Sequence, residues 1–414
     1  MEDPVCKTMP ELVASFVDTF VDFSVGGIFL PPSNPNLTPN SASQVSFPTD
    51  PSPAPQPLQT RYPAPDRLIA IGDLHGDLEK SKQAFRLAGL IDGSDRWTGG
   101  SAAVVQVGDV FDRGGEELKI LYFLEKLKRE AVRSGGYLIT INGNHEIRNV
   151  EGNFGYATKA GLEEFRAWGF WFLAGNQIKD LCRGLEKQKD PFQGIPSVIP
   201  GVKEEYQHGF RARIAALRPD GPIARRFLSK NLTVAVVGDS VFVHGGVLAD
   251  HVNYGLERIN EEVSNWLNGL MGKSDPAHCK GRNAVIRSRK FSDDSKTSCD
   301  CSALEHVLAT IPGAKRMIMG HTIQKFGING VCDNRAIRID VGMSKGCTNG
   351  LPEVLEINGN SELQVLTSNP LYQNKSKSYL GADRKQGSNT YLGADRKQEP
   401  GVLLPEHKEV AVEA

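Results

Sequence analysis

The feature that most constrains the fold is a recurring unit in which a short apolar, β-branched run ends at once in a polar turn containing glycine. The first three runs and their turns are Arg67–Ile71 with 72–77, Ala102–Val107 with 108–114, and Tyr137–Ile141 with 143–146. Such runs, bounded by turn residues, indicate strands. The stretches between them, Leu78–Gly89 and Glu116–Ser134, read as helices. Strands that alternate with helices predict a βαβαβ unit with a parallel sheet.

Strand-like runs continue in the second half of the chain. They are Leu232–Val237, Ser240–Val243, Lys315–Met319, Ala336–Val341 and Val354–Ile357. The first two flank Gly238-Asp239, which predicts a hairpin. Its second strand leads into His-Gly-Gly at 244–246, and the next run leads into Gly-His-Thr at 320–322. Because α/β sheets carry their chemistry at the carboxyl ends of strands, we expect these turns to meet at one site.

Five of the turns carry side chains that bind metal ions. In chain order these are Asp73 and His75, Asp109, Asn144 and His145, His244, and His321. A Gly-Asp pair after a strand is, by itself, more often only a turn. Five turns that together supply carboxylate, imidazole and carboxamide groups suit divalent ions instead. We therefore predict a dinuclear metal site.

Two ions that lie ~3.5–4 Å apart need a shared ligand, and a carboxylate can bridge where an imidazole normally cannot. Asp109, on the second strand, is the natural bridge. Asp73 and His75 are then expected on the first ion, and Asn144, His244 and His321 on the second. A water between the ions would have its pKa lowered towards neutrality and act as the nucleophile. Neither a cysteine nor a serine nucleophile is required.

Two-metal sites with an activated water include those of phosphatases, and hydrolysis of a phosphate ester would also need a cation and a proton donor. Arg113 lies one short turn after Asp109, and its planar guanidinium can grip two phosphoryl oxygens. His145, next to an expected ligand but not used as one, is the candidate donor for the leaving group. Asp112 is expected to hold that imidazole in the right tautomer and keep it protonated. A lone histidine is more often a core residue, but its place in Gly-Asn-His-Glu favours the catalytic role.

The motifs together resemble the phosphoprotein phosphatase superfamily. They are Gly-Asp-Leu-His-Gly at 72–76, Gly-Asp-Val-Phe-Asp-Arg-Gly at 108–114, Gly-Asn-His-Glu at 143–146, His-Gly-Gly at 244–246 and Gly-His-Thr at 320–322. The resemblance covers roughly residues 67–345. The form of the set is most similar to the Shewanella-like phosphatases of plants, and to their second, non-chloroplast branch.

This resemblance implies an α/β calcineurin-like metallophosphoesterase fold, a central β-sandwich flanked by helices. It implies two divalent ions, with Mn²⁺ as the first choice and Fe or Zn as alternatives, and phosphoprotein substrates with phosphoserine and phosphothreonine favoured. It also implies the ligand and acid roles given above. The family has a second phosphate-binding arginine, for which Arg289 is the candidate, although its usual tryptophan neighbour is Arg287 here.

Two other functions compete with a protein phosphatase. A dinucleoside polyphosphate hydrolase would share the same motifs and metals. A catalytically inactive scaffold that binds phosphoproteins is the second, but the intact ligand set with His145 and Arg113 argues against it. No Ser-Ala-Pro-Asn-Tyr segment follows His321, so we do not expect inhibition by microcystin or okadaic acid.

Composition changes along the chain suggest its organisation. The catalytic domain is expected at 62–370, with a helical insert at about 150–230 because Asn144 and His244 lie 100 positions apart. A segment at 1–30 contains an amphipathic helix at 10–24, which either docks on its own domain or binds a partner. The insert is a second candidate surface for a protein partner. Eleven of the 24 prolines fall in residues 31–65, which predicts a linker at 31–61. The tail at 371–414 carries a short polar repeat at 379–386 and 391–398.

The bulk properties exclude several partners and suggest a location. The formal net charge is −1 over 414 residues, which disfavours a nucleic-acid-binding surface. Acidic residues interrupt the apolar stretch at 11–30, so no membrane span or signal peptide is expected. Seven scattered cysteines do not suggest a disulfide scaffold. The cytoplasm is the expected location, with the mitochondrial intermembrane space as the alternative.

Three cysteines, Cys279, Cys299 and Cys301, cluster around Arg289 and leave three interpretations open. They can be ordinary reduced thiols. They can form a zinc knuckle with His278, although a Cys-x-Cys spacing is unusual for one. In the third interpretation Cys279 pairs with Cys299 or Cys301 and pins the loop that presents Arg289.

Overall fold

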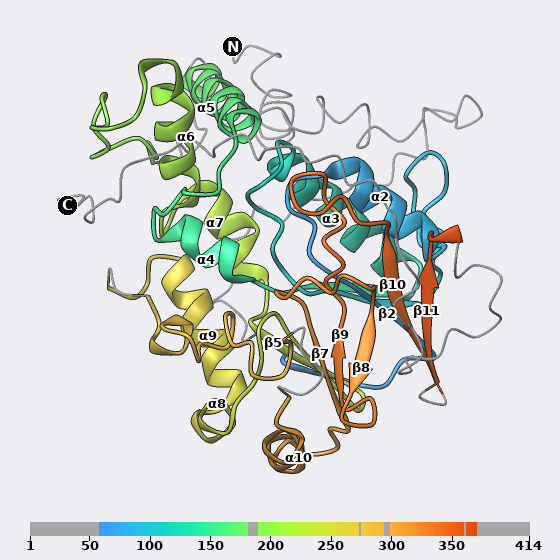
Figure 1. Ribbon diagram of the computed structural model, residues 1–414. Coiled ribbons are helices and arrows are strands. Elements are labelled where there is room, and N and C mark those ends of the chain that lie inside the picture. Colours follow the sequence, from blue (N-terminus) through green and yellow to red (C-terminus); the bar gives the residue numbers. More distant parts are fainter. Residues whose placement is uncertain (1–57, 181–188, 273–274, 294–298, 360–361, 371–414) are drawn as a thin grey trace, which may run out of the picture.

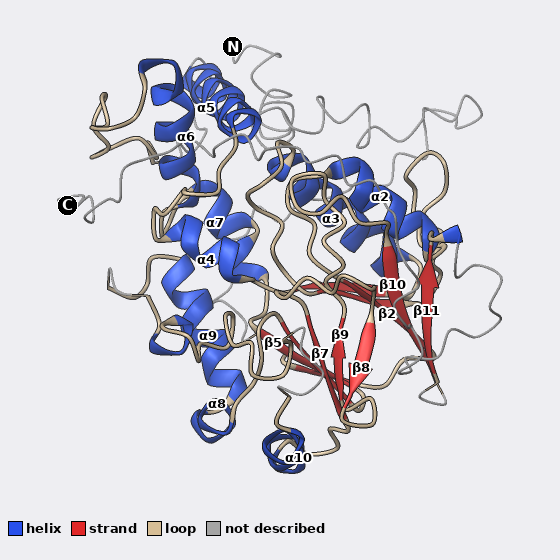
Figure 2. Ribbon diagram, viewed as in Figure 1, coloured by secondary structure: helices blue, strands red, loops and turns tan. Residues whose placement is uncertain are grey.

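Two β-sheets and their covering helices make up the computed structural model (Figure 1). It describes residues 58–180, 189–272, 275–293, 299–359 and 362–370. Buried side chains from both sheets belong to one hydrophobic core. Figure 2 shows the strands at the centre and right of the view, with helices above, to the left and below them, which confirms the expected α/β sandwich.

The five-stranded sheet contains the predicted βαβαβ unit. Its strands, in spatial order, are β11 (Leu363–Thr367), β10 (Glu353–Asn358), β2 (Arg67–Ile71), β3 (Ala103–Gln106) and β4 (Tyr137–Thr140). Strands β2, β3 and β4 are parallel, whereas β10 pairs with β2 in the antiparallel sense. Two helices, α2 (Leu78–Leu87) and α3 (Glu117–Arg133), connect the parallel strands and pack against this sheet. The boundaries lie within three residues of those expected from the sequence.

The six-stranded sheet brings the second set of turns to the centre. Its order is β1 (Arg61–Tyr62), β5 (Val234–Val237), β6 (Ser240–Val243), β7 (Arg316–Met319), β9 (Ala336–Arg338) and β8 (Asn329–Val331). The predicted hairpin is confirmed, because β5 pairs antiparallel with β6 through Gly238 and Asp239. Three helices lie beside this sheet: α8 (Ala249–Tyr254) and α9 (Leu256–Leu267) to its left in Figure 2, and α10 (Cys301–Thr310) below it. A short 3₁₀ turn, η3 (Ala277–Cys279), follows α9.

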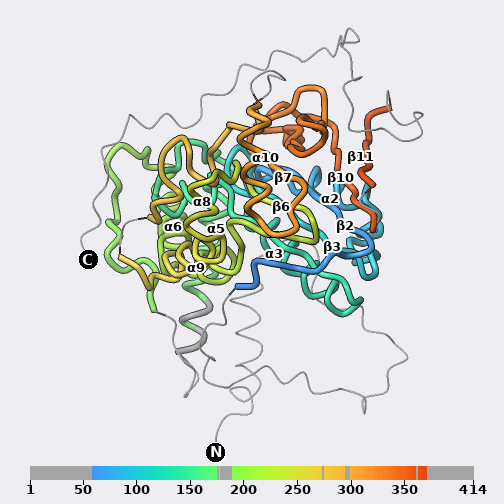
Figure 3. The backbone as a smooth tube through the Cα atoms, turned by 90° about the horizontal axis from the view of Figure 1, so that it is seen from below, coloured from blue at the N-terminus to red at the C-terminus, as the bar shows by residue number. Residues whose placement is uncertain are grey.

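Between β4 and β5, every element that the structure describes is helical. They are α4 (Asn144–Val150), α5 (Lys159–Asp180), η1 (Glu204–Tyr206), α6 (Gln207–Leu217), α7 (Pro222–Arg226) and η2 (Leu228–Lys230). Helices α5 and α6 pack together, and a small apolar cluster around Phe154 and Phe210 joins them. Seen from below, this helical part lies on the opposite side of the molecule from β10 and β11 (Figure 3).

The folded domain begins before residue 62, where sequence analysis placed the end of the linker. Arg61 pairs with Val236 in β1, and the backbone carbonyl of Thr60 accepts a hydrogen bond from the Val236 N–H at 2.8 Å. Thr60 is buried and its hydroxyl also contacts Asn260. The expected helix at 10–24 and the repeat at 379–398 lie outside the described residues. Among those described, no helix has the length and apolar character to span a membrane.

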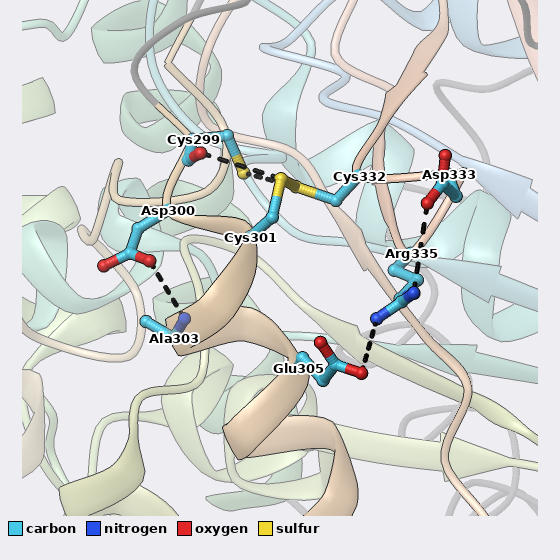
Figure 4. The surroundings of a disulfide bond; sticks show 8 residues. All are labelled: Cys299, Asp300, Cys301, Ala303, Glu305, Cys332, Asp333 and Arg335. Atoms are coloured by element: carbon cyan, nitrogen blue, oxygen red, sulfur yellow. Dashed lines mark hydrogen bonds and ion pairs between the residues drawn. A yellow bond between two sulfur atoms is a disulfide. The ribbon is translucent and has the colours of Figure 1, made fainter.

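The cysteines agree with the first interpretation only in part, since Cys279 and Cys299 are free thiols but Cys301 is not. Cys301, at the start of α10, forms a disulfide with Cys332 in the turn between β8 and β9, 31 positions away. Figure 4 shows Cys299 beside this bond, its Sγ 3.3 Å from that of Cys332. Cys279 is a free thiol buried in the core, so the proposed pairing of Cys279 with Cys299 or Cys301 is wrong. The β8–β9 turn brings Cys332 to α10, a proximity that sequence spacing does not reveal.

Candidate active site

The turns after β2, β3, β4, β6 and β7 meet at one point, as their positions at strand ends predict. The backbone N–H of His75 donates to the Asp109 carbonyl at 2.9 Å, which joins the first two turns. The backbone N–H of His321 donates to the Asp73 carboxylate at 3.2 Å, which joins the first turn to the last. His244 completes the group, with its Nε2 3.2 Å from Asp109 Oδ2. The two sheets therefore contribute to one buried site.

Asp109 lies between two clusters of possible metal ligands. One consists of His75, Asp109 and His145, and the other of Asp109, His244 and His321, with the ligand atoms of each within 4.8 Å of one another. Asn144 Oδ1 is 3.0 Å from His244 Nε2, and Asp73 Oδ2 is 4.0 Å from His75 Nε2. A carboxylate shared by two clusters has the geometry of a bridging ligand.

The imidazoles of this site are oriented to offer lone pairs. His75 Nδ1 lies 2.9 Å from the Phe111 carbonyl and His244 Nδ1 lies 2.9 Å from the Val107 carbonyl. A carbonyl only accepts, so each Nδ1 carries a proton, and each Nε2 faces Asp109 Oδ2 on the side where a cation would bind. Burial lowers the pKa of His75 to about 3 and that of His321 to about 2, so these rings are neutral. Nitrogen and oxygen donors of this kind fit divalent ions.

The carboxylates add to the same conclusion. Asp73 and Asp109 are almost completely buried, and a third acid, Asp340, is buried with them. Burial raises the pKa of Asp73 well above its usual value, and the charges of Asp340 and Asp109 raise it further. Buried acids of like charge are stable in ionised form only when cations neutralise them. This donor set therefore fits divalent metal binding.

The backbone of these turns is held in an unusual conformation. Five of the eleven described non-glycine residues with positive φ are His75, Asp109, Asp112, Arg113 and His321. Such conformations cost free energy and persist where the surrounding structure holds them. Gly143 allows the close approach of two turns, because a Cβ there would lie 2.2 Å from Asp109 Oδ1. Nearly half of the described residues with this strained backbone therefore belong to the site.

His145 and Asp112 form a closely bonded pair beside the ligands. His145 Nδ1 is 2.6 Å from Asp112 Oδ2, and the backbone N–H of His145 donates to Asp109 Oδ1 at 2.9 Å. Arg113 Nη2 lies 3.4 Å from His145 Nε2, and its guanidinium stands over the ring of Tyr156. The imidazole of His145, which Asp112 holds, and the guanidinium of Arg113 therefore lie next to each other beside the possible ligands.

The family comparison agrees with this geometry. The model of the calcineurin-like phosphoesterase family matches residues 66–325, which include every residue named above as a possible ligand. The chain is a calcineurin-like phosphoesterase. It is 61% identical over 411 residues to Shewanella-like protein phosphatase 2 of Arabidopsis thaliana, with 99% of this chain and 98% of that protein aligned. It therefore belongs to the Shewanella-like protein phosphatases, a group of metal-dependent protein phosphatases.

Two further relatives of this phosphoesterase are more distant. Shewanella-like protein phosphatase 1 of Plasmodium berghei is 44% identical over 99 residues, which cover 24% of this chain and 27% of that protein. The cold-active protein-tyrosine phosphatase of a psychrophilic Shewanella species has a similar fold, with a TM-score of 0.52. The two are 16% identical over 75% of this chain and 83% of that one. That likeness shows the fold alone.

Arg289 of this phosphoesterase lies at the last ligand turn. Its Nη1 donates to Thr322 Oγ1 at 2.8 Å, next to His321, and its charge helps to lower the pKa of that histidine. Arg287, two positions earlier, is turned away and pairs with Glu151 at the end of α4 at 3.4 Å. The structure thus brings Arg289 to the site and gives Arg287 a partner elsewhere.

Sequence reasoning missed several residues of the site in this phosphoesterase. Asp340 was read as part of a strand, although the strand ends at Arg338. Cys347 accepts a hydrogen bond from Arg113 at 3.4 Å, and Tyr156 packs against the ring of His145. Arg213 contacts Asp112 from the distant helix α6. The sequence did contain a signal that Arg213 would be buried. It falls three positions after Phe210 and four before Leu217, on the apolar side of a helix.

Proposed function

We propose that this phosphatase hydrolyses phosphate monoesters with Asp109 bridging two divalent ions. The supporting observation is that Asp109 belongs to both clusters of ligand atoms. Asp73 and His75 would hold one ion, and Asn144, His244 and His321 the other. If bound there, the ions would lower the pKa of a water and so make it available as the nucleophile. Mn²⁺ is the proposed metal, with Fe or Zn as alternatives, because all the donors are oxygen or nitrogen.

The remaining residues act on the substrate. Arg113 and Arg289 would bind the phosphoryl oxygens, as guanidinium groups do in bidentate fashion. His145 would donate a proton from Nε2 to the leaving oxygen, while Asp112 accepts a hydrogen bond from Nδ1 at 2.6 Å. This arrangement keeps the imidazole oriented with Nε2 towards the possible metal ligands, 3.8 Å from Asp109 Oδ2.

The pairing of His145 with Asp112 supports phosphoserine and phosphothreonine as substrates. An alkoxide leaves with difficulty unless an acid protonates it, whereas the phenolate of phosphotyrosine is a better leaving group. A paired histidine and aspartate at the site therefore matter most for alkyl phosphates.

For the location, the disulfide between Cys301 and Cys332 supports an oxidising compartment. We therefore propose the mitochondrial intermembrane space ahead of the cytoplasm. Counting free thiols in the protein purified from its own compartment, without added reductant, tests this choice. If both cysteines are alkylated as free thiols, the cytoplasm is favoured.

The function is tested with four substrates and Mn²⁺: a phosphoserine peptide, a phosphotyrosine peptide, p-nitrophenyl phosphate and diadenosine tetraphosphate. We expect turnover of the peptides with phosphoserine preferred, two ions per chain by elemental analysis, and loss of activity with a chelator. Asp109→Asn should abolish turnover, because it removes the bridging charge. Activity that survives chelation, or one ion per active chain, would refute the two-metal site. Preferential hydrolysis of the dinucleotide would favour the rival function.

The role of His145 is tested with His145→Asn. Metal content should stay the same, while kcat on the phosphoserine peptide falls by about 10²–10⁴, the range for losing a general acid. The loss should be smaller on p-nitrophenyl phosphate, whose leaving group needs little protonation. His306→Asn is the control, since His306 is exposed on α10. Equal losses on both substrates would show that His145 is not the acid.

A further inference from the structure

Arg213 of α6 reaches the site from the helical insert and is fully buried. Its guanidinium makes three hydrogen bonds with different partners. Nη2 donates to Asp112 Oδ1 at 3.0 Å, Nη1 to Glu117 Oε2 at 2.6 Å, and Nε to Asn149 Oδ1 at 2.8 Å. These partners come from the turn after β3, from α3 and from α4. One side chain thus connects the insert to three parts of the site.

The surroundings of Arg213 leave its charge only these partners. Three aromatic rings enclose the guanidinium, with Cζ lying 4.7 Å from the centre of Phe165, 5.5 Å from Phe154 and 5.8 Å from Phe111. A buried charge is costly unless it is paired and hydrogen-bonded. Apolar residues of similar volume could fill such a space for packing alone. The presence of an arginine here therefore indicates that its role is to hold its hydrogen-bond partners in place.

Asp112 is the partner that links Arg213 to the chemistry. Its Oδ2 faces His145 Nδ1 at 2.6 Å and accepts from Asn149 Nδ2 at 3.0 Å, while Oδ1 accepts from Arg213. Arg213 also donates to Asn149 Oδ1, which fixes the amide so that its Nδ2 points at Asp112. Asn149 Nδ2 is in addition 2.8 Å from the His145 carbonyl. Arg213 therefore orients both groups that orient His145.

We propose that Arg213 is a positioning residue that locks Asp112, and through it His145, in the geometry for protonating the leaving group. This inference rests on the proposed role of His145 as the acid. It makes the helical insert part of the catalytic machinery, because α6 carries the residue that holds the proton donor in place. Lysine cannot replace it, since the three bonds use the planar fork of a guanidinium and diverge to three partners.

A purely structural role predicts different kinetics. If Arg213 only held α6 against α3, its loss would lower the activity on every substrate by the same factor. If it positions the acid, its loss matters most when the leaving group is poor. The Michaelis constant should not change in either case, because Arg213 touches no atom that faces the phosphate. The dependence on the leaving group therefore separates the two roles.

The experiment uses Arg213→Lys and Arg213→Met with phenyl phosphate and p-nitrophenyl phosphate. We expect kcat for phenyl phosphate to fall by about 10²-fold and that for p-nitrophenyl phosphate by less than about tenfold, with KM unchanged. Arg226→Met is the matched control. Arg226 of α7 also forms an ion pair, 3.0 Å from Glu125, and lies over the ring of Tyr122, but it has no bond to Asp112 in the structure. Its loss should affect both substrates equally.

A double variant tests whether Arg213 acts through His145. Arg213→Met leaves two buried acids without their cation and can fail to fold, so Arg213→Lys, which keeps the charge, is made alone and together with His145→Asn. In the His145→Asn background Arg213→Lys should have almost no further effect on kcat, because the acid is already lost. Equal losses on both substrates, or additive losses in the double variant, would overturn the inference. If His145→Asn itself shows no dependence on the leaving group, the proposed function fails instead.

Discussion

Glu146 provides the sharpest test of how the ligand turns are held. It is buried on α4, and its two carboxylate oxygens accept four backbone N–H groups. Oε1 accepts from Val110 at 2.8 Å and Phe111 at 3.2 Å, and Oε2 from Asp109 at 2.8 Å and Gly143 at 2.6 Å. The first three donors belong to the turn of Asp109, the proposed bridging residue, and the fourth precedes Asn144, a proposed ligand. One carboxylate therefore connects two of the turns that carry proposed metal ligands.

Glu146→Gln should be strongly destabilising, although the two side chains have the same shape. An amide keeps one acceptor oxygen, so in either orientation two of the four backbone donors face an NH₂ group. A buried donor without an acceptor costs about 1–3 kcal/mol, so the variant should lose about 2–6 kcal/mol. That loss is a large part of the roughly 5–15 kcal/mol that stabilises a typical domain.

The assay has two parts. Stability is measured by urea denaturation of the metal-free protein, with unfolding monitored by circular dichroism. Metal affinity is measured separately, by titrating the folded protein with Mn²⁺. The Mn²⁺ affinity should also fall, because the turn that carries Asp109 is no longer held. Glu353→Gln is the matched control. Buried Glu353 on β10 accepts the Ile328 N–H and the Thr367 hydroxyl, so its amide can accept from the first and donate to the second. A Glu146→Gln variant as stable as this control, with unchanged Mn²⁺ affinity, would refute the reasoning.

Three further outcomes are expected. Arg113→Ala should raise KM as well as lower kcat in steady-state kinetics, because it removes phosphate contacts in both the bound and the transition state. Burial raises the pKa of Glu164 to about 8, so the folded chain holds a proton that the unfolded chain releases above 4.5. Thermal stability should therefore fall as the pH rises from 5 to 8, and this slope should flatten in Glu164→Gln. A chain of residues 58–370 should keep the activity of the full chain. One that begins at residue 62 should be less stable, because it lacks Thr60 and its hydrogen bonds to Val236 and Asn260.

Sequence patterns located the strands that carry the site better than those that complete the sheets. Strand β2 has the predicted bounds, and β3 and β4 end one residue earlier than expected. These strands are short and mostly apolar, and a glycine follows each within three residues, so both the apolar run and the turn signal are strong. Strands β8 and β11 were missed because Asn329–Val331 and Leu363–Thr367 are only partly buried and carry weaker apolar patterns. Nothing in the sequence indicated that β10 would lie antiparallel beside β2.

The same distinction applies to the site residues. Those predicted from the turns come together because parallel strands bring their carboxyl ends to one edge, a rule that needs no tertiary information. The pairing of Cys301 with Cys332 needed the position of the β8–β9 turn, which only the sheet order determines. The orientation of Arg287 towards Glu151 likewise depends on how α4 packs against a loop more than 130 positions away.

The insert shows why distance along the chain is a poor guide to catalytic roles. Arg213 lies 101 positions from Asp112 and bonds to it inside the core. Glu164 of α5 accepts the N–H groups of Leu118 and Lys119 at the start of α3, the helix that also supplies Glu117. Helices α5 and α6 of the insert are thus bonded to the layer directly behind His145. An addition that is built into this layer constrains the catalytic geometry, and changes in its packing should alter kcat before they alter the choice of substrate.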